Sequence, residues 1–239
     1  MITLFNFGPN FNLPDPSPFC LKVETYLRAT GLEFTIVSDL NNLGSAPKKK
    51  LPYIIDNGQV IGDSAFIIEY LKDTYGDPLD QDLNPEQRAI ARAFSKMLDE
   101  NLYFCMLYGR WIDPAAWPVV KQTFFGSMPF PFNKIIPFTA QRSVKKSLQA
   151  QGIGRHSHAE ILSVARQDLT ALACLLGTKD YFLINKPTTL DICAYAFLAQ
   201  FMIPQYKSGF NDLGRSFTNL VAFVERLKMR YYPEHVENK

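Results

Sequence analysis

The first 76 residues alternate strand-like and helix-like segments in an order that few folds share. Short runs of β-branched and aromatic residues flank one helix-like segment, which gives the series 2–7, 18–30 and 34–37. Ser17 and Pro18 favour a helix start, and Gly31 favours a helix end where positive φ is needed. The pattern predicts a βαβ unit, in which a helix joins two parallel strands.

A hairpin and a second helix complete this unit. Asn57-Gly58 adopts positive φ readily at both positions, so it predicts a two-residue turn between strands at 53–56 and 59–61. Residues 64–75 have the apolar spacing of an amphipathic helix and end at a Gly-Asp-Pro sequence. We therefore expect a βαβ-ββα domain over residues 1–77.

The second part of the chain carries helix signals only. Asn84-Pro85 predicts the start of a long helix that runs to Arg110. Three more helices are predicted at 158–176, 188–203 and 217–231. Five prolines between Pro114 and Pro137 predict short or interrupted helices in that stretch.

Charge supports a division near residue 80. Residues 1–80 hold 6 basic and 10 acidic side chains (net −4), whereas residues 81–239 hold 19 and 13 (net +6). We expect a second, all-helical domain over residues 84–239.

Composition narrows the functional classes. A formal charge of +2 over 239 residues implies no obligate nucleic-acid or membrane partner. The longest apolar stretch, 192–204, is shorter than the roughly 20 residues needed to span a bilayer, so we expect no stable membrane insertion. Four widely spaced cysteines, three of them in apolar stretches, and no leader-like start favour a reducing, cytoplasmic location.

Two features of the second part, a pair of histidines and a basic stretch, could be mistaken for binding sites. His156 and His158 face different directions on a helix and lack a third ligand nearby, so we predict no metal site. Ser157 and Glu160 instead have capping-box spacing. Residues 114–159 hold six basic and no acidic side chains; we interpret them as a solvated face, with contact to anionic lipid or nucleic acid as the alternative.

Four local sequences together resemble the glutathione transferase superfamily. In chain order they match its active-site turn, its cis-proline, its acidic-Ser helix start and its buried helix cap: Ser17-Pro18-Phe19-Cys20, Leu51-Pro52, Asp63-Ser64 and Pro187-Thr188-Thr189-Leu190-Asp191. The resemblance covers essentially the whole chain. It implies a thioredoxin-like α/β domain followed by an all-α helical bundle, with a homodimer as the default assembly.

Within the superfamily, two sequences are most similar to the metaxin-related branch. They are FCLKVETYL at 19–27 and QGIGRHS at 151–157. This branch includes failed-axon-connections and cadmium-responsive glutathione transferase-like proteins, and it contains import and adhesion-related members. The resemblance therefore leaves two functions open, a glutathione transferase and a non-catalytic interaction module.

The resemblance implies that glutathione is the co-substrate and that Ser17 is the catalytic residue. The Ser17 hydroxyl would donate a hydrogen bond to the glutathione sulfur, and the positive end of the following helix would further stabilise the thiolate. Cys20 gives the alternative: a single thiol in the first helical turn could form a mixed disulfide with glutathione, as in a thiol transferase.

The remaining glutathione contacts are implied at three places. Leu51, before a cis-Pro52, would pair with the cysteinyl part of the tripeptide. Asp63-Ser64 would bind the ammonium and carboxylate of the γ-glutamyl end, while Lys49 and Lys50 would attract the glycyl carboxylate. An apolar electrophile would bind against the helical domain, at Tyr103, Met106, Leu107, Arg110, Trp111 and the aromatic stretch 117–132.

Overall fold

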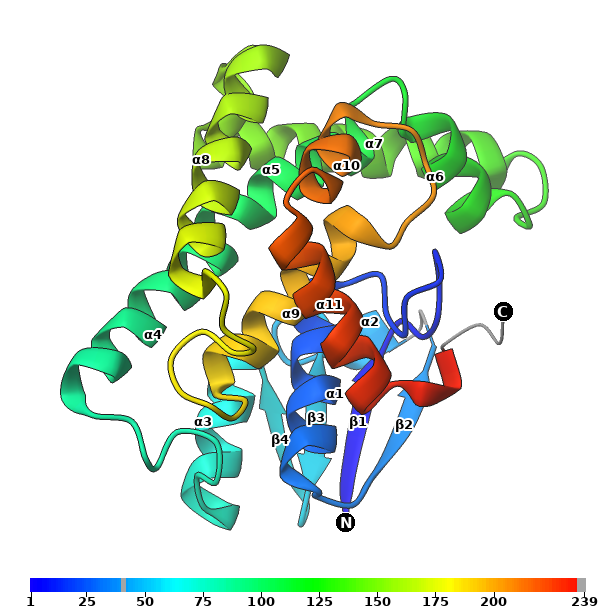
Figure 1. Ribbon diagram of the computed structural model, residues 1–239. Helices are drawn as coiled ribbons and strands as arrows, with labels where there is room; N and C mark the ends of the chain where they lie inside the picture. The colour runs from blue at the N-terminus through cyan, green and yellow to red at the C-terminus, as the bar shows by residue number, and fades with distance from the viewer. Residues whose placement is uncertain (40–41, 236–239) are drawn as a thin grey trace.

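The computed structural model describes residues 1–39 and 42–235. An α/β unit forms the lower part of the molecule in Figure 1, and helices form the rest. The sheet has the strand order β2-β1-β3-β4; β1 and β2 are parallel and the other pairs are antiparallel. The strands are β1 (Ile2–Asn6), β2 (Phe34–Ser38), β3 (Tyr53–Asp56) and β4 (Gln59–Gly62). This arrangement confirms the predicted βαβ-ββα unit.

The helices of this unit begin and end at the predicted residues. Helix α1 spans Pro18–Thr30 and α3 spans Ser64–Tyr75, the bounds expected from the sequence. Gly31 follows α1 with φ 70°, and the hairpin turn has φ 48° at Asn57 and 81° at Gly58. A short helix that the sequence does not predict, α2 (Asn42–Ser45), precedes β3. Local residue chemistry is therefore sufficient to place α1 and α3, which carry candidate site residues at their N-termini.

The second part is helical throughout its described residues. The predicted long helix is continuous, but it includes a wider π-helical turn, η1 (Leu98–Leu102), between α4 (Pro85–Met97) and α5 (Tyr103–Trp111). The remaining helices and 3₁₀ turns are α6 (Trp117–Phe125), α7 (Phe132–Gln151), η2 (Ile153–Arg155), α8 (His158–Leu176), α9 (Thr189–Met202), α10 (Gly209–Arg215), α11 (Thr218–Tyr231) and η3 (Pro233–His235).

The proline-rich stretch corrects one prediction. Helix α6 is short, as expected, but α7 runs for 20 residues through Pro137, so the expectation of short or interrupted helices is wrong there. Pro137 is the sixth residue of α7 and lies inside the helix, where its missing N–H removes one hydrogen bond of the helix. The helix nevertheless continues for 14 residues beyond it.

Helix α9 forms the centre of the molecule. All residues from Leu190 to Met202 are buried, and α1 packs directly against them. One hydrophobic cluster extends across both parts of the chain, from Ile2 to Tyr232. The apolar stretch noted at 192–204 thus belongs largely to a core helix, and no helix in the described residues is long and apolar enough to cross a membrane.

The predicted cap of α9 is present. One carboxylate oxygen of Asp191 accepts from the Thr188 amide at 2.8 Å and its hydroxyl at 2.6 Å; the other accepts from the Phe182 amide at 2.8 Å. Because the site is buried, these hydrogen bonds satisfy polar groups that water does not reach. The cap therefore fixes where the core helix begins.

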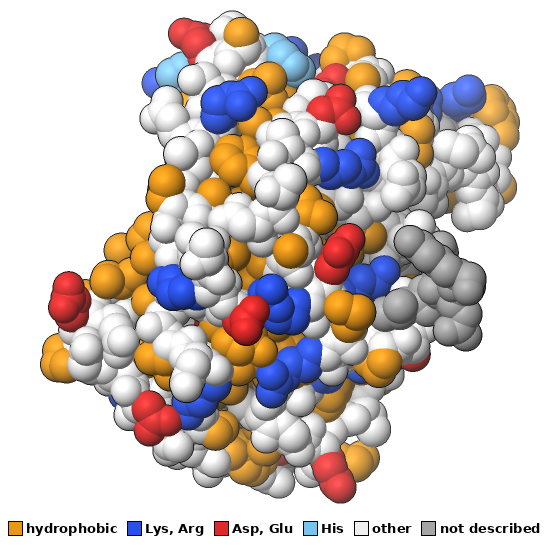
Figure 2. All heavy atoms as spheres, in the orientation of Figure 1, with side chains coloured by type: hydrophobic (Ala, Val, Ile, Leu, Met, Phe, Trp, Pro, Cys, Tyr) orange, Lys and Arg blue, Asp and Glu red, His pale blue; other side chains and the backbone are white. Residues whose placement is uncertain are grey.

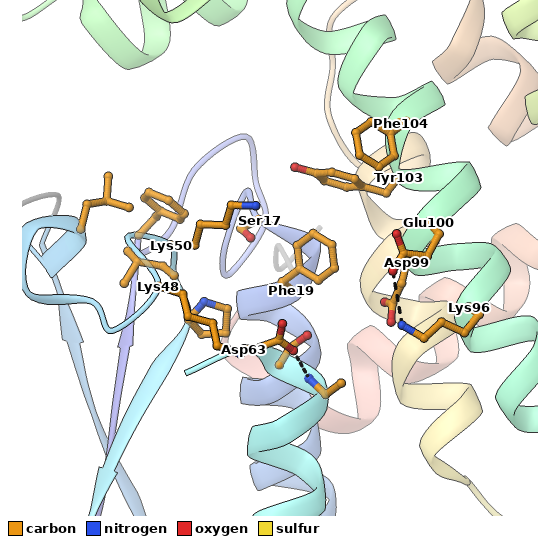
Figure 3. A pocket seen from close by; sticks show the side chains of 16 residues that line it. Ser17, Phe19, Lys48, Lys50, Asp63, Lys96, Asp99, Glu100, Tyr103 and Phe104 are labelled. Atoms are coloured by element: carbon orange, nitrogen blue, oxygen red, sulfur yellow. Dashed lines mark hydrogen bonds and ion pairs between the residues drawn. The ribbon is translucent and has the colours of Figure 1, made fainter. Parts of the chain in front are cut away.

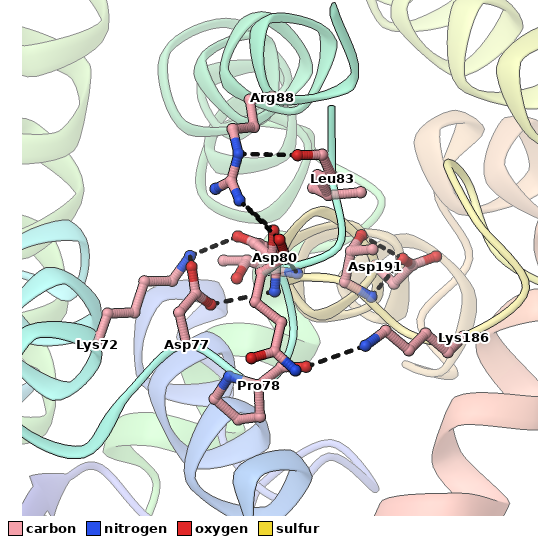
Figure 4. A network of polar contacts seen from close by, with 11 residues as sticks. Lys72, Asp77, Pro78, Asp80, Leu83, Arg88, Lys186 and Asp191 are labelled. Atoms are coloured by element: carbon pink, nitrogen blue, oxygen red, sulfur yellow. Dashed lines mark hydrogen bonds and ion pairs between the residues drawn. The ribbon is translucent and has the colours of Figure 1, made fainter. Parts of the chain in front are cut away.

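The segment between α3 and α4 is tied to both parts of the molecule (Figure 4). The Asp80 carboxylate accepts from the Thr189 amide of α9 at 2.8 Å and pairs with Lys72 of α3. The Asp80 carbonyl accepts from Arg88 of α4 at 2.6 Å. This segment is thus a fixed connection, and the division into residues 1–77 and 84–239 stays a prediction.

Candidate functional site

A cavity of about 430 Å³ lies between the α/β unit and the helices (Figure 3). One wall comes from the α/β unit, and the facing wall comes from the continuous helix α4–η1–α5. Six residues predicted as site residues line it: Ser17, Lys50, Leu51, Pro52, Asp63 and Ser64. Residues that are up to 47 positions apart in the chain are therefore brought together at one place.

Ser17 stands directly before α1 and lines the cavity. Its hydroxyl oxygen accepts a long hydrogen bond from the Cys20 amide at 3.4 Å, the expected N-cap interaction. A hydroxyl that accepts a hydrogen bond can still donate its own hydrogen to another group. Ser17 lines the cavity beside Phe19. The geometry therefore provides a hydroxyl donor at the positive end of a helix.

A buried carboxylate that the sequence analysis does not identify holds the Ser17 loop. Asp15 is fully buried and accepts from the amides of Phe7 (2.9 Å), Gly8 (3.0 Å) and Ser17 (2.7 Å). Burial raises the pKa of Asp15 to about 7, although the three amides oppose this shift. In the sequence, the only sign of this role is that Asp15 stands between two prolines, two residues before the predicted cap at Ser17.

Arg110 belongs to the same support and not to the electrophile pocket. Its guanidinium is buried and donates to the Pro16 carbonyl at 2.5 Å, to Gln200 at 2.6 Å and to the Tyr206 hydroxyl at 3.2 Å. Gln200 in turn donates to the Asp15 carbonyl at 3.2 Å. The predicted role of Arg110 in substrate binding is therefore wrong; it fastens the loop before α1 to the core helix α9.

The peptide bond between Leu51 and Pro52 is cis, as predicted. β3 begins to pair with β1 at Tyr53, so both residues lie just before the paired part of the strand. Both residues line the cavity, and the backbone of Leu51 is not paired with β1. This segment is placed to pair with an extended peptide.

The start of α3 presents a carboxylate and a hydroxyl to the same wall. Asp63 has φ 83° and caps α3 by accepting from the Ala65 amide at 3.0 Å. Ser64 is buried beside it and also lines the cavity. The combination offers an anion, a hydroxyl and helix N–H groups within one turn.

One of the two predicted lysines is wrongly assigned. Lys50 lines the cavity, but Lys49 does not; its ammonium donates to the Gly44 carbonyl at 2.7 Å. Lys49 has φ 53°, so the chain turns there and presents its two neighbours, Lys48 and Lys50, to the cavity. A run of three lysines gives no sign of which residue takes the left-handed conformation.

The helical wall differs from the predicted one. It consists of Lys96, Asp99, Glu100, Tyr103 and Phe104, so of the predicted residues only Tyr103 lines the cavity. Met106 is buried in the core, Leu107 packs against that core, and Trp111 packs on Trp117 and Phe124 of α6. The lining residues keep the three- and four-residue spacing of one helical face, so the cavity lies further toward the N-terminal end of this helix than predicted.

This wall carries charge and a phenol. Asp99 accepts from the ammonium of Lys22 of α1 at 2.8 Å, and this largely buried ion pair connects the two walls. The Lys96 ammonium lies 3.3 Å from Glu100 (Figure 3). Tyr103 packs edge-on against Phe19 with ring centres 4.8 Å apart, and burial raises the pKa of Tyr103. The helical wall is therefore a mixed polar and aromatic surface, more polar than the predicted one.

The structure disfavours thiol chemistry through Cys20. Cys20 is fully buried, burial raises its thiol pKa, and it does not line the cavity. Cys105 and Cys193 are also buried, as expected, whereas Cys174 is exposed. A buried thiol with a raised pKa forms little thiolate, so Cys20 is unsuited to attack a disulfide.

The histidines and their neighbours are accounted for without a metal. Ser157 and Glu160 form the predicted capping box, with the Ser157 amide donating to Glu160 at 2.7 Å. His158 packs against Tyr108 and Phe210. Within the described ranges, no group of three or more His, Cys, Asp or Glu side chains could hold a metal ion.

Comparison with known proteins identifies the class. Residues 18–116 match the family model of the glutathione S-transferase N-terminal domain, and residues 165–227 match that of the C-terminal domain. The structure is similar to the crystal structure of the β-etherase LigF from Sphingobium sp. strain SYK-6, with a TM-score of 0.68, 22% identity and coverage of 100% of this chain and 99% of that one. The fold is that of the glutathione transferases.

Curated relatives place the chain more closely. It is 35% identical over 240 residues to the isoprene-epoxide–glutathione S-transferase of Rhodococcus sp. (strain AD45), covering 97% of this chain and 99% of that protein. It is 34% identical to Failed axon connections of Drosophila melanogaster (98% and 59% covered) and 27% identical to human metaxin-2 (90% and 82% covered). The chain belongs to the glutathione transferase superfamily and is similar to its metaxin-related branch.

Proposed function

We propose that this protein is a glutathione transferase that activates the thiol of glutathione for attack on a small, largely apolar electrophile. The observation that carries the proposal is the convergence of six residues, predicted to bind or activate glutathione and including Ser17, on one cavity. The glutathione thiol has a pKa near 8.5, so most of it is protonated at neutral pH. A group that stabilises the thiolate therefore raises the concentration of the reactive form.

Ser17 supplies that stabilisation. Its hydroxyl donates to the sulfur anion, and the N-terminus of α1 adds a favourable dipole. The sulfur then forms a bond to an electrophilic carbon, and the bond between that carbon and its leaving atom breaks. The leaving atom takes the electron pair and is protonated, while the thiol proton passes to solvent.

The rest of the tripeptide follows the α/β wall. Asp63 binds the γ-glutamyl ammonium, and Ser64 with the helix N–H groups of α3 binds the adjoining carboxylate. Leu51 pairs with the cysteinyl backbone, and Lys48 and Lys50 attract the glycyl carboxylate. Each end of glutathione thus meets opposite charge.

The electrophile lies against the helical wall, between Phe19, Tyr103 and Phe104. A small aliphatic epoxide suits this surface, because its carbons contact the rings and its oxygen becomes an alkoxide when the ring opens. The Tyr103 hydroxyl lies in the cavity and is placed to donate to that oxygen. The similarity to an isoprene-epoxide–glutathione S-transferase supports this choice of substrate class.

The direct test is formation of the conjugate from glutathione and an aliphatic epoxide, followed by mass spectrometry. We expect the wild-type protein to form the adduct and Ser17→Ala to lower kcat about 100-fold, with glutathione affinity nearly unchanged. Ser147→Ala, on the exposed surface of α7, is the matched control. Turnover that is equal in both variants would remove Ser17 from the mechanism.

The similarity to metaxins and Failed axon connections favours one alternative, a non-catalytic interaction module. It predicts no conjugate with a broad panel of electrophiles, while the fold and its partner-binding surfaces are retained. The homodimer and the cytoplasmic location also stay proposals, and sedimentation and cell fractionation test them.

A further inference from the structure

Helices α6 and α7 and the loop between them form an arm that projects beyond the body of the molecule (Figure 1). Large apolar side chains are exposed on this arm: Phe130 (81%), Phe138 (65%), Phe132 (54%) and Ile135 (53%). Figure 2 shows hydrophobic and basic atoms together at the upper right, where Figure 1 places the arm. Burying these apolar groups against a partner would be favourable.

The exposed basic residues of α7 and two of its exposed apolar residues lie on one face. At 100° per residue, these six fall within an arc of about 120°: Lys134, Ile135, Phe138, Arg142, Lys145 and Lys146. The side of the helix next to this arc holds the arm to the body, since Pro137 and Leu148 are buried and Gln141 donates to the Trp111 carbonyl at 2.8 Å. The outer face therefore has a fixed orientation.

The charge of this face has one sign. Residues 114–159 contain six basic and no acidic side chains, and four of the basic ones lie on the outer face of α7. Their positive potential favours an anionic partner. Ile135 and Phe138, among these cations, favour a partner that also accepts apolar side chains.

We propose that the outer face of the α6–α7 arm binds the surface of an anionic phospholipid bilayer. The lysines and arginine contact the headgroups, and Phe130 and Phe138 enter the boundary with the acyl chains. A nucleic-acid backbone would satisfy the cations but offers no apolar layer to an isoleucine. The protein lies on the membrane and does not span it. This inference is independent of the cavity and of the proposed reaction.

Flotation with vesicles tests the proposal. The full chain is mixed with vesicles of phosphatidylcholine alone or with about 30% phosphatidylserine, at low and at high salt. We expect binding only to the anionic vesicles, and weaker binding at high salt. Lys145→Glu/Lys146→Glu should lower the partition coefficient at least about tenfold, and Phe138→Ser should lower it several-fold.

Control variants reverse charges or remove an apolar side chain at exposed positions away from the arm. Arg92→Glu/Arg166→Glu reverses two exposed charges on α4 and α8, and Met229→Ser removes an exposed apolar side chain of α11. Both should bind vesicles like the wild type. All substitutions are at exposed positions, and circular dichroism confirms that each variant is folded.

Four results would overturn the proposal. They are no binding to either vesicle, equal binding to both, equal loss in the arm and control variants, and tighter binding to a 20-base-pair DNA duplex than to the anionic vesicles. Light scattering adds a fifth: a dimer that dissociates in Phe138→Ser would assign this face to a second copy of the chain.

Discussion

The two walls of the cavity are built in different ways. The α/β wall is made at main-chain turns: the cap at Ser17, the cis peptide before Pro52 and the cap at Asp63. The helical wall is made of side chains along α4–η1–α5, such as Glu100 and Tyr103. The positions of turn residues follow from local chemistry, whereas the face of a long helix depends on its phase and packing. A glutathione site is therefore easier to infer from sequence than the site of its co-substrate.

The largest expected effect comes from cutting the connection between the walls. Asp99→Ala leaves the ammonium of Lys22, with a side chain only 4% exposed, without its partner. An unpaired buried charge should lower the free energy of unfolding by about 3–5 kcal/mol, measured by chemical denaturation.

A matched control uses the exposed pair on the same helix. Lys96→Met breaks the ion pair with Glu100 and should cost less than about 1 kcal/mol. The double variant Lys22→Met/Asp99→Leu should recover most of the lost stability, because no charge is left buried. Equal losses in Asp99→Ala and Lys96→Met would show that the walls are not joined through this pair.

The second expected effect is a pH dependence of the α/β wall. The carboxyl of Asp15 has a pKa of about 7 in the folded chain and 3.8 when it is exposed to water, as in the unfolded chain. The folded chain therefore binds the proton of this carboxyl more tightly than the unfolded chain does. The free energy of unfolding should therefore fall as pH rises through the range between these values. Between pH 5 and 8 the Asp15 contribution changes by about 3 kcal/mol.

Denaturation at the two pH values, in the wild type and in Asp15→Asn, measures this contribution. The amide introduced by this substitution does not titrate, so the variant should show a smaller pH dependence than the wild type. Asp168 and Asp191, whose pKa values burial raises to about 6, contribute equally to both proteins and cancel. An unchanged pH dependence would show that Asp15 is ionised in the folded chain throughout the range.

Asp63 separates glutathione binding from the cap of α3. Asp63→Ala should weaken glutathione binding about tenfold, because the γ-glutamyl ammonium loses its carboxylate partner. Asp63→Ser keeps a helix-capping oxygen but no charge, so it should weaken binding as much while preserving stability. Asp73→Ala, at an exposed position of α3, is the control for calorimetry. Retained affinity in Asp63→Ser would place the γ-glutamyl end elsewhere.

The smallest expected effect lies on the helical wall. Tyr103→Phe keeps the ring contact with Phe19 but removes the hydroxyl, so kcat/KM for an aliphatic epoxide should fall about fivefold. Glutathione affinity should stay unchanged. Tyr108→Phe, on the same helix but outside the cavity, should have no effect on either value. Loss of glutathione affinity in Tyr103→Phe would contradict the assignment of glutathione to the α/β wall and of the electrophile to the helical wall.

The sequence predicts much of the fold because its helix ends carry strong signals. The bounds of α1 and α3 follow from a cap, an N1 proline and glycines, whose conformational preferences are local. The six predicted residues that line the cavity lie at such turns.

The wrong predictions depend on distant contacts. The sequence suggests Arg110 at the substrate, but its partners, Pro16 and Gln200, are about 90 positions away along the chain. Asp99 and Glu100 line the cavity because it lies further toward the N-terminal end of this long helix than the sequence suggests, which depends on how the helix packs against the α/β unit. Asp15 is a different case: its three amide donors lie only two to eight residues away, but they come from a loop whose path no local pattern encodes. Such positions require the folded structure.

Calorimetry with glutathione and with S-hexylglutathione tests the central claim most directly. We expect both compounds to bind to the wild-type protein at neutral pH and the hexyl derivative to bind more tightly, because its chain contacts Phe19, Tyr103 and Phe104. If neither compound binds, the cavity is not a glutathione site and the protein does not activate this thiol.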